Sequence, residues 1–275
     1  MLSAPADERF LLGLLVILLT LPVTLLSVAF YFRKVSRRTK DLINAGHYTG
    51  GSAILSGAMR GWYYDKLRPF EEFFLKIRIS PNVLTTIGFA LSMVAAAFFH
   101  FGWIGPGGWM VLVSGTFDIF DGAVARKSRK ITTSGAFFDS VLDRLGDMAV
   151  HIGLLSYYMQ PGRTSLTWMF WVVLAGMISA NLVSYTRAKA ESYGVKGDVG
   201  IMQRPERFVF LGFGGVFSSH IHAMLAPLTP QNHAIFAGAI IFVTFLSILT
   251  AFKRFQVVFR VLKRSESSDD RISPE

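Results

Sequence analysis

The segment DIFDGAVARKSRKITTSGAFFDSVLDRLGD, residues 118–147, lies in the middle of the chain, and four of its five aspartates form two pairs at helical spacing. On a helix, Asp118 and Asp121 share a face because they are three residues apart. Asp139 and Asp143 share a face because they are four apart. If two such helices face each other, the four carboxylates converge, and they cannot all stay ionised without a cation. Because Mg²⁺ prefers carboxylate oxygens, the pattern predicts a divalent metal site.

Small residues and one arginine accompany these acids. Gly122 and Ala125 lie beside the first acidic pair, and Gly135 lies one turn before the second. Their lack of side-chain bulk leaves room for a flat or bulky ligand. Arg126 adds a fork-shaped group suited to phosphate. A structural cluster of buried ion pairs is the alternative, but the neighbouring cations are too few to neutralise four acids.

The helices that carry these acids are expected to cross a membrane. The chain has 275 residues, of which 52% are hydrophobic and 25 are phenylalanine. This composition is typical of a polytopic membrane protein with one compact helical domain. The absence of cysteine excludes disulfides and thiolate metal ligands. The net charge of +10 indicates cytoplasmic loops and anionic lipid, and no segment resembles a nucleic-acid-binding module.

Seven apolar segments are long enough to span a bilayer. Basic residues gather in alternate loops, which predicts that the N-terminus lies outside and the C-terminus inside. Both acidic pairs then lie at the cytoplasmic end of their helices, so we expect an integral protein of the cell (inner) membrane with a cytoplasmic active site. The predicted spans are 10–32, 81–102, 108–127, 134–158, 166–188, 207–225 and 233–252.

The spans and their flanks divide the chain into parts. In chain order we expect an N-terminal transmembrane anchor with a basic flank (1–40), a cytoplasmic linker with an interfacial helix (41–80), a core (81–260) and a disordered polar tail (261–275). Aromatic and charged residues alternate over 62–78, which favours a helix in the membrane interface, with a solvated linker as the alternative. Ser80 and Pro81 form a capping sequence that opens the core.

The acidic segment resembles the signature of the CDP-alcohol phosphatidyltransferases. It runs D-x-x-D-G-x-x-A-R from Asp118 to Arg126, then eight residues, then G-x-x-x-D-x-x-x-D from Gly135 to Asp143. The resemblance implies an all-α fold, a polytopic membrane helix bundle with a six-helix core, to which this chain adds one N-terminal transmembrane helix. It also implies transfer of a phosphatidyl group from CDP-diacylglycerol to an alcohol, with release of CMP.

The same resemblance implies roles for individual residues. Asp118, Asp121, Asp139 and Asp143 would hold two Mg²⁺ or Mn²⁺ ions. Asp143 would also be the general base that deprotonates the acceptor hydroxyl, unless it is purely a metal ligand. No serine, cysteine or lysine is placed as a nucleophile, so direct displacement is expected. The residues implied at the nucleotide and CDP-lipid site are Gly122, Ala125, Arg126, Gly135, Asn82 and Thr85.

A second basic group lies at later cytoplasmic helix ends and loops. Its members are Arg187, Lys189, Arg204, Arg207 and Arg254. Ordinary positive-inside charge is one interpretation. The sequences RAKAE and RPER, with D-R-x-x-D ending at Asp147, resemble instead the branch of the family that uses inositol phosphate. This resemblance implies that the basic residues hold the acceptor's phosphate, and that Asp147 either accepts hydrogen bonds from a polyol or pairs with a basic neighbour.

The expected function is therefore phosphatidyl transfer from CDP-diacylglycerol to a phosphorylated alcohol, with inositol 1-phosphate as the first candidate. The same chemistry on glycerol 3-phosphate or another alcohol is an alternative, and a divalent-cation transporter is an alternative from another class. A transporter would carry its acids near the midplane of interrupted, repeated helices, whereas these acids lie at one end. Expected partners are the two substrates, membrane lipid and a second copy in a homodimer; nucleic acid is not expected.

Overall fold

The computed structural model describes residues 57–162, 164–195, 199–225 and 233–269. Within these ranges the regular structure is entirely helical, which confirms the all-α class. The helices are α3 (Gly57–Lys76), α4 (Pro81–His100), α5 (Ile104–Lys127), α6 (Thr133–Met159), α7 (Met169–Ser192), α8 (Arg204–Leu225) and α9 (Ala234–Asp269). The predicted N-terminal span, 10–32, lies outside the described residues.

Polar caps fix the starts of two helices that matter for the site. Ser80 caps α4, since its side chain accepts a hydrogen bond from the backbone N–H of Val83, and Pro81 occupies the first turn as predicted. Thr132 caps α6, because its Oγ1 accepts from the backbone N–H of Gly135 at 3.0 Å. The cap on α6 sets the start of the helix that carries the second acidic pair.

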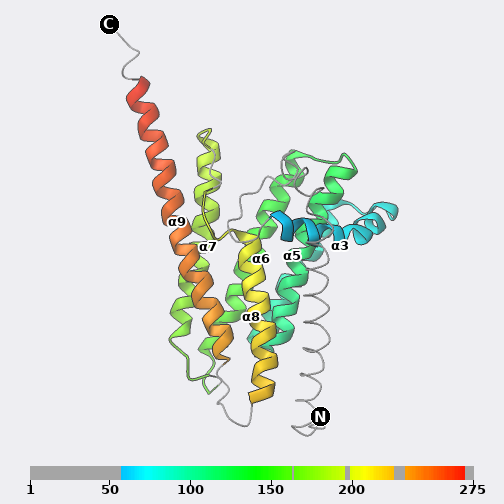
Figure 1. Ribbon diagram of the computed structural model, residues 1–275, viewed down its shortest axis with the longest axis vertical. Helices are drawn as coiled ribbons and strands as arrows, with labels where there is room; N and C mark the ends of the chain where they lie inside the picture. Colours follow the sequence, from blue (N-terminus) through cyan, green and yellow to red (C-terminus); the bar gives the residue numbers. More distant parts are fainter. Residues whose placement is uncertain (1–56, 163, 196–198, 226–232, 270–275) are drawn as a thin grey trace.

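Helices α4 to α9 run along a common direction and form a bundle, while α3 lies across it (Figure 1). Helix α4 packs against α5 and α6, α5 packs against α8, and α7 packs against α9. Successive helices run in opposite directions, so the second half of α5 and the first half of α6 meet at one end of the bundle. That end carries all four aspartates of the predicted metal site.

Glycine allows α5 and α8 to approach closely. A Cβ atom on Gly108 would lie 2.5 Å from the carbonyl oxygen of Gly212 and 2.9 Å from the backbone nitrogen of Val216. Small residues at such crossings are the usual means of close helix packing in membranes. This contact brings the start of α8 beside the acidic ends of α5 and α6.

Three of the described helices are long and apolar enough to cross a membrane: α4, α7, and α9 from Ala234 to Ser265. Helix α9 extends beyond the other helices of the bundle (Figure 1) and continues to Asp269. Residues 261–269 are therefore helical, which differs from the expectation of a disordered tail from 261. The reason is local, because no glycine or proline interrupts the chain between Arg254 and Asp269.

Candidate functional site

Three carboxylates from α5 and α6 form an acidic centre. Asp118, Asp121 and Asp139 each offer one oxygen, and these oxygens lie within 4.8 Å of one another. Asp121 is buried, and Oδ1 of Asp139 is buried without a hydrogen-bond partner among the described residues. A buried carboxylate oxygen without a partner is costly unless a cation satisfies it. The donor set therefore fits a hard divalent cation such as Mg²⁺ or Mn²⁺.

Asp143, the fourth predicted ligand, lies beside this centre and is ion-paired. Nη1 of Arg204, the first residue of α8, lies 2.7 Å from Oδ1 of Asp143 and 2.7 Å from Oδ1 of Asp118. The guanidinium also lies over the ring of Phe208, with Cζ 4.8 Å from the ring centroid. Arg204 thus joins α5 and α6 at the edge of the acidic centre and supplies positive charge there.

Asp147 anchors a group of arginines one turn further along α6. Its side chain is 3% exposed, and Nη2 of Arg207 donates to its Oδ2 at 2.7 Å. Nε of Arg204 donates to its Oδ1 at 3.2 Å, and Nη1 of Arg144 lies 3.6 Å from its Oδ2. Of the two roles expected for Asp147, the structure shows the pairing with basic neighbours. Several cations around one buried carboxylate compensate the loss of its hydration.

Arg144 is absent from the predicted site residues, although the sequence carries a signal for it. It lies three residues before Asp147, and residues at this spacing share a helix face. Its second contact, a hydrogen bond from Nη1 to Oγ of Ser184, joins α6 to α7. Local spacing in the sequence cannot indicate a contact between segments this far apart.

A cavity of about 1010 Å³ opens beside the acidic centre, between α6, α7, α8 and α9. Its charged lining residues are Asp118, Asp143, Arg144, Arg187, Glu191, Arg204, Arg207 and Arg254. Arg207 is 2% exposed, and its Nη1 has no hydrogen-bond partner in the part of the chain that the structure describes. Buried donors are normally satisfied, so this nitrogen is suited to an oxygen of a ligand in the cavity.

The cavity gathers four of the five predicted acceptor-site cations. Arg254 is buried, and its guanidinium donates to the carbonyl oxygens of Val199 and Val183 at 2.9 and 2.5 Å. Arg187 is exposed on the cavity wall and pairs with Glu191 at 2.8 Å. Lys189 does not line this cavity; its Nζ lies 5.1 Å from the centroid of the Tyr193 ring.

The residues expected at the nucleotide lie on α4, on α5 and in the first turn of α6. A Cβ on Gly122 would lie 3.2 Å from Nη1 of Arg126, and one on Gly135 would lie 2.9 Å from Oγ1 of Thr132 and 3.4 Å from Oδ1 of Asn82. Ala125 is half-buried, whereas Asn82 and Arg126 are exposed. The absence of a side chain at the two glycines thus leaves room for neighbouring polar side chains, including the capping hydroxyl of Thr132.

Thr85 contacts a carboxylate, which sequence spacing does not indicate. Its Oγ1 donates to Oδ2 of Asp121 at 2.7 Å and lies 3.1 Å from the carbonyl oxygen of Pro81. Thr85 is 6% exposed, so this hydrogen bond is shielded from water. The hydroxyl therefore fixes the orientation of Asp121 in the acidic centre.

Replacing Thr85 by valine should weaken Mn²⁺ binding by about tenfold, because outer partners of this kind orient metal ligands. Valine keeps the shape of threonine but loses the donor to Asp121. The affinity would be measured on purified protein by titration of free Mn²⁺ in electron paramagnetic resonance. Thr85→Ser should bind like the wild type, as should Thr86→Val, whose hydroxyl is exposed and donates to the carbonyl oxygen of Asn82. Unchanged affinity in Thr85→Val would contradict this role.

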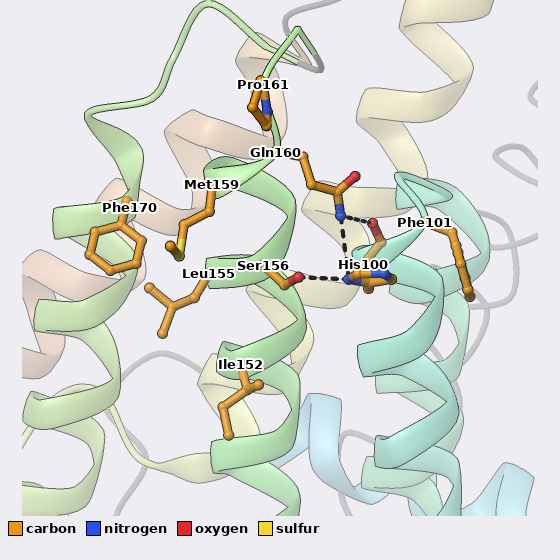
Figure 2. A pocket seen from close by; sticks show the side chains of 9 residues that line it. All are labelled: His100, Phe101, Ile152, Leu155, Ser156, Met159, Gln160, Pro161 and Phe170. Carbon is orange, nitrogen blue, oxygen red and sulfur yellow. Dashed lines mark hydrogen bonds between the residues drawn. The ribbon is translucent and has the colours of Figure 1, made fainter.

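A second pocket, of about 570 Å³, lies at the opposite end of the bundle and is lined mainly by apolar side chains (Figure 2). Nδ1 of His100 lies 2.6 Å from Oγ of Ser156, and Nε2 of Gln160 donates to the carbonyl oxygen of His100 at 2.9 Å. None of the predicted site residues lines it. These polar groups tie the end of α4 to the end of α6. The carboxylates that could hold a metal and the arginine-lined cavity lie at the opposite, acidic end.

The chain is similar to known proteins over most of the described helices. The family model of the CDP-alcohol phosphatidyltransferases matches residues 78–249. A phosphatidylinositol phosphate synthase from Cutibacterium acnes is 34% identical over 152 residues, which are 54% of this chain and 71% of that protein.

Solved structures of the Mycobacterium tuberculosis phosphatidylinositol phosphate synthase are also similar, at 27% identity. The one with CDP-DAG bound has a TM-score of 0.58 and is matched over 70% of this chain and 92% of that chain. The one in complex with manganese and citrate has a TM-score of 0.59 and is matched over 70% and 88%. With its several apolar helices and a family match over more than half its length, the chain is an integral membrane enzyme that belongs to the CDP-alcohol phosphatidyltransferase family.

Proposed function

We propose that this enzyme transfers the phosphatidyl group of CDP-diacylglycerol to inositol 1-phosphate and releases CMP. The observation that carries the proposal is the position of the acidic centre beside the arginine-lined cavity. Asp118 belongs to both, and Arg204 joins them. A metal-binding group suited to a diphosphate thus adjoins a pocket suited to a second phosphorylated molecule. The names of the relatives support the same acceptor.

The donor would bind at the acidic centre. Asp118, Asp121 and Asp139 would hold the metal, with two Mg²⁺ or Mn²⁺ ions in the full site. When bound, such ions neutralise the diphosphate and stabilise the charge that develops on departing CMP. Gly122, Ala125 and Gly135 would leave space for the cytidine, and the exposed Asn82 and Arg126 would contact the nucleotide and its phosphates.

The acceptor would bind in the cavity. Arg187, Arg207 and Arg254 would surround its phosphate, whereas Asp147 would hold Arg204 and Arg207 in position through the pairs that it forms. Asp143 lines the same cavity and would take the proton from the attacking hydroxyl. The hydroxyl oxygen then forms a bond to the phosphorus of the phosphatidyl group, and the bond between that phosphorus and the CMP oxygen breaks.

The proposed membrane arrangement follows the distribution of charge. Helices α4 to α8 and the part of α9 up to residue 260 would form the six-helix core, the proposed domain 81–260, and the segment 10–32 would add a seventh span. The acidic end would face the cytoplasm, with the N-terminus outside and the C-terminus inside the cell membrane. We further propose that the enzyme is a homodimer.

The test is CMP release by purified enzyme from CDP-diacylglycerol with a panel of alcohols. Free inositol and serine should be poor acceptors, because only a phosphorylated alcohol satisfies the arginines of the cavity. Among phosphorylated alcohols, the names of the relatives favour inositol 1-phosphate as the best acceptor. The panel should include glycerol 3-phosphate, free inositol and serine. Faster CMP release with glycerol 3-phosphate would indicate that glycerol 3-phosphate is the acceptor instead of inositol 1-phosphate. Metal uptake into liposomes without CMP release would instead favour a transporter.

A further inference from the structure

The backbone that leads into α8, residues 199–203, is held by a side chain of α9. Oγ1 of Thr250 accepts hydrogen bonds from the backbone N–H groups of Ile201 and Met202, at 3.2 and 3.0 Å. Thr250 is 2% exposed and Met202 is 0% exposed. Buried backbone donors need a partner, and this one hydroxyl supplies it for two successive residues. We name residues 199–203 the entry segment of α8.

Gly200 allows α9 to come this close to the entry segment. Its φ of +139° lies in a region that residues with a side chain rarely adopt. A Cβ at this position would lie 2.2 Å from Cγ2 of Thr250, far inside van der Waals contact. Arg254, one turn after Thr250 on α9, donates from Nε to the carbonyl oxygen of Val199 at 2.9 Å. Two side chains of α9 thus hold the entry segment in place.

Gln203 ends the entry segment and caps α8. Its backbone N–H donates to Oε2 of Glu206 at 3.1 Å, and its carbonyl oxygen accepts from the backbone N–H of Arg207 at 3.2 Å. This is one half of a capping box, in which a glutamate three residues into the helix binds the backbone of the cap. Because the cap fixes how the chain enters the helix, the position of the entry segment determines where the first turn of α8 lies.

The first turn of α8 carries the two arginines that bind Asp147. Arg204 and Arg207 line the cavity beside the acidic centre, whereas Thr250 does not. Arg207 is 2% exposed, and a side chain packed this closely has little room to compensate for a shift of its backbone. We infer that Thr250 is a positioning residue of the acceptor site, which acts through the entry segment to place Arg204 and Arg207 for the acceptor's phosphate. This inference rests on the proposed function.

Hydrogen exchange tests the entry segment without turnover. In Thr250→Val the side chain keeps its shape but offers no acceptor, so the amides of Ile201 and Met202 should exchange about tenfold faster than in the wild type. Thr250→Ser keeps the hydroxyl and should exchange like the wild type. Thr244→Val is the matched control, since Thr244 is also a buried threonine of α9 but donates to the carbonyl oxygen of Val172 at 3.4 Å. Unchanged exchange in Thr250→Val would show that the hydroxyl does not hold the segment.

Kinetics separate positioning from a merely structural role. Thr250→Val should raise the KM for inositol 1-phosphate about tenfold, with little change in kcat or in the KM for CDP-diacylglycerol. Gly200→Ala should do the same by displacing the entry segment, which provides a second variant if the first does not fold. Thr250→Ser and Thr244→Val should match the wild type. Equal changes in both KM values, or an unchanged KM for the acceptor, would overturn the inference.

The inference and the proposed function can fail separately. If the wild type uses glycerol 3-phosphate instead, the proposed acceptor is wrong, but the same selective change should appear in the KM for glycerol 3-phosphate, which also carries a phosphate. If the wild type uses inositol 1-phosphate and Thr250→Val leaves its KM unchanged, only the inference is wrong. A wild type that uses no phosphorylated alcohol would refute both.

Discussion

Replacing Asp118 or Asp139 by asparagine should lower the rate of CMP release more than about 100-fold while the protein still folds. Asparagine keeps the shape of aspartate but removes the negative charge that a divalent cation requires. Each residue supplies one of three carboxylate oxygens that lie within 4.8 Å of one another. Chelation by EDTA should therefore abolish transfer in the wild type, and added Mg²⁺ or Mn²⁺ should restore it. The measurement is the rate of CMP release at saturating substrates.

Two variants sharpen this experiment. Asp65→Asn changes an exposed acid on α3 and should leave the rate unchanged. Asp143→Asn separates the two roles expected for Asp143, which lies outside the group of three and pairs with Arg204. If Asp143 is the base, this variant loses activity but binds Mn²⁺ like the wild type; if it is a ligand, Mn²⁺ affinity falls as well. Full activity in the presence of EDTA would refute a metal-assisted reaction.

Arg207→Ala should raise the KM for inositol 1-phosphate by about ten- to a hundredfold, because one charge-assisted hydrogen bond contributes roughly 1.5–3 kcal/mol. Nη2 of Arg207 is held by Asp147, which leaves the buried Nη1 for a ligand oxygen in the cavity. The KM for CDP-diacylglycerol should change little, because we propose that the donor binds at the acidic centre and not in the cavity. Steady-state kinetics with each substrate varied in turn would measure both constants.

The chain offers a matched control for this change. Lys189 carries the same charge but lies outside the cavity lining, so Lys189→Ala should leave both KM values near those of the wild type. Asp147 keeps Arg204 and Arg144 as partners in Arg207→Ala, so the fold should persist. An effect of Arg207→Ala on CDP-diacylglycerol alone, or better use of free inositol or serine, would refute the assignment of the acceptor site.

The helices of the bundle could be predicted from sequence because each is an apolar run bounded by recognisable ends. Ser80 and Pro81 marked the start of α4, and the described helices α4 to α8 begin and end within a few residues of the predicted spans. The exception is α9, whose apolar part ends near Lys253 although the helix continues to Asp269. Hydrophobic length predicts where a helix leaves the membrane and carries no information about where it stops in water.

The acidic centre was predictable in part, because residue spacing along a helix determines which side chains share a face. Spacing along α5 and α6 places Asp118, Asp121 and Asp139 on facing sides of two neighbouring helices, and the structure brings them together. Spacing could not show that Arg204 comes between Asp118 and Asp143, since it reaches them from a helix more than fifty residues away. The hydrogen bond from Thr85 to Asp121 likewise depends on how α4 packs against α5.

The position of Arg204 has a consequence for the order of events during turnover. Its Nη1 lies 2.7 Å from Oδ1 of Asp118, which also belongs to the acidic centre, so a metal ion bound there would compete with this guanidinium for the carboxylate. Arg204 also lines the acceptor cavity, where a phosphate would draw it away from Asp118. Linkage makes such an effect reciprocal: if the acceptor favours occupancy of the metal site, the loaded metal site favours the acceptor by the same factor. The acceptor and the metal ion would then bind with positive heterotropic cooperativity, and CDP-diacylglycerol would take part in it to the extent that its diphosphate binds through the metal.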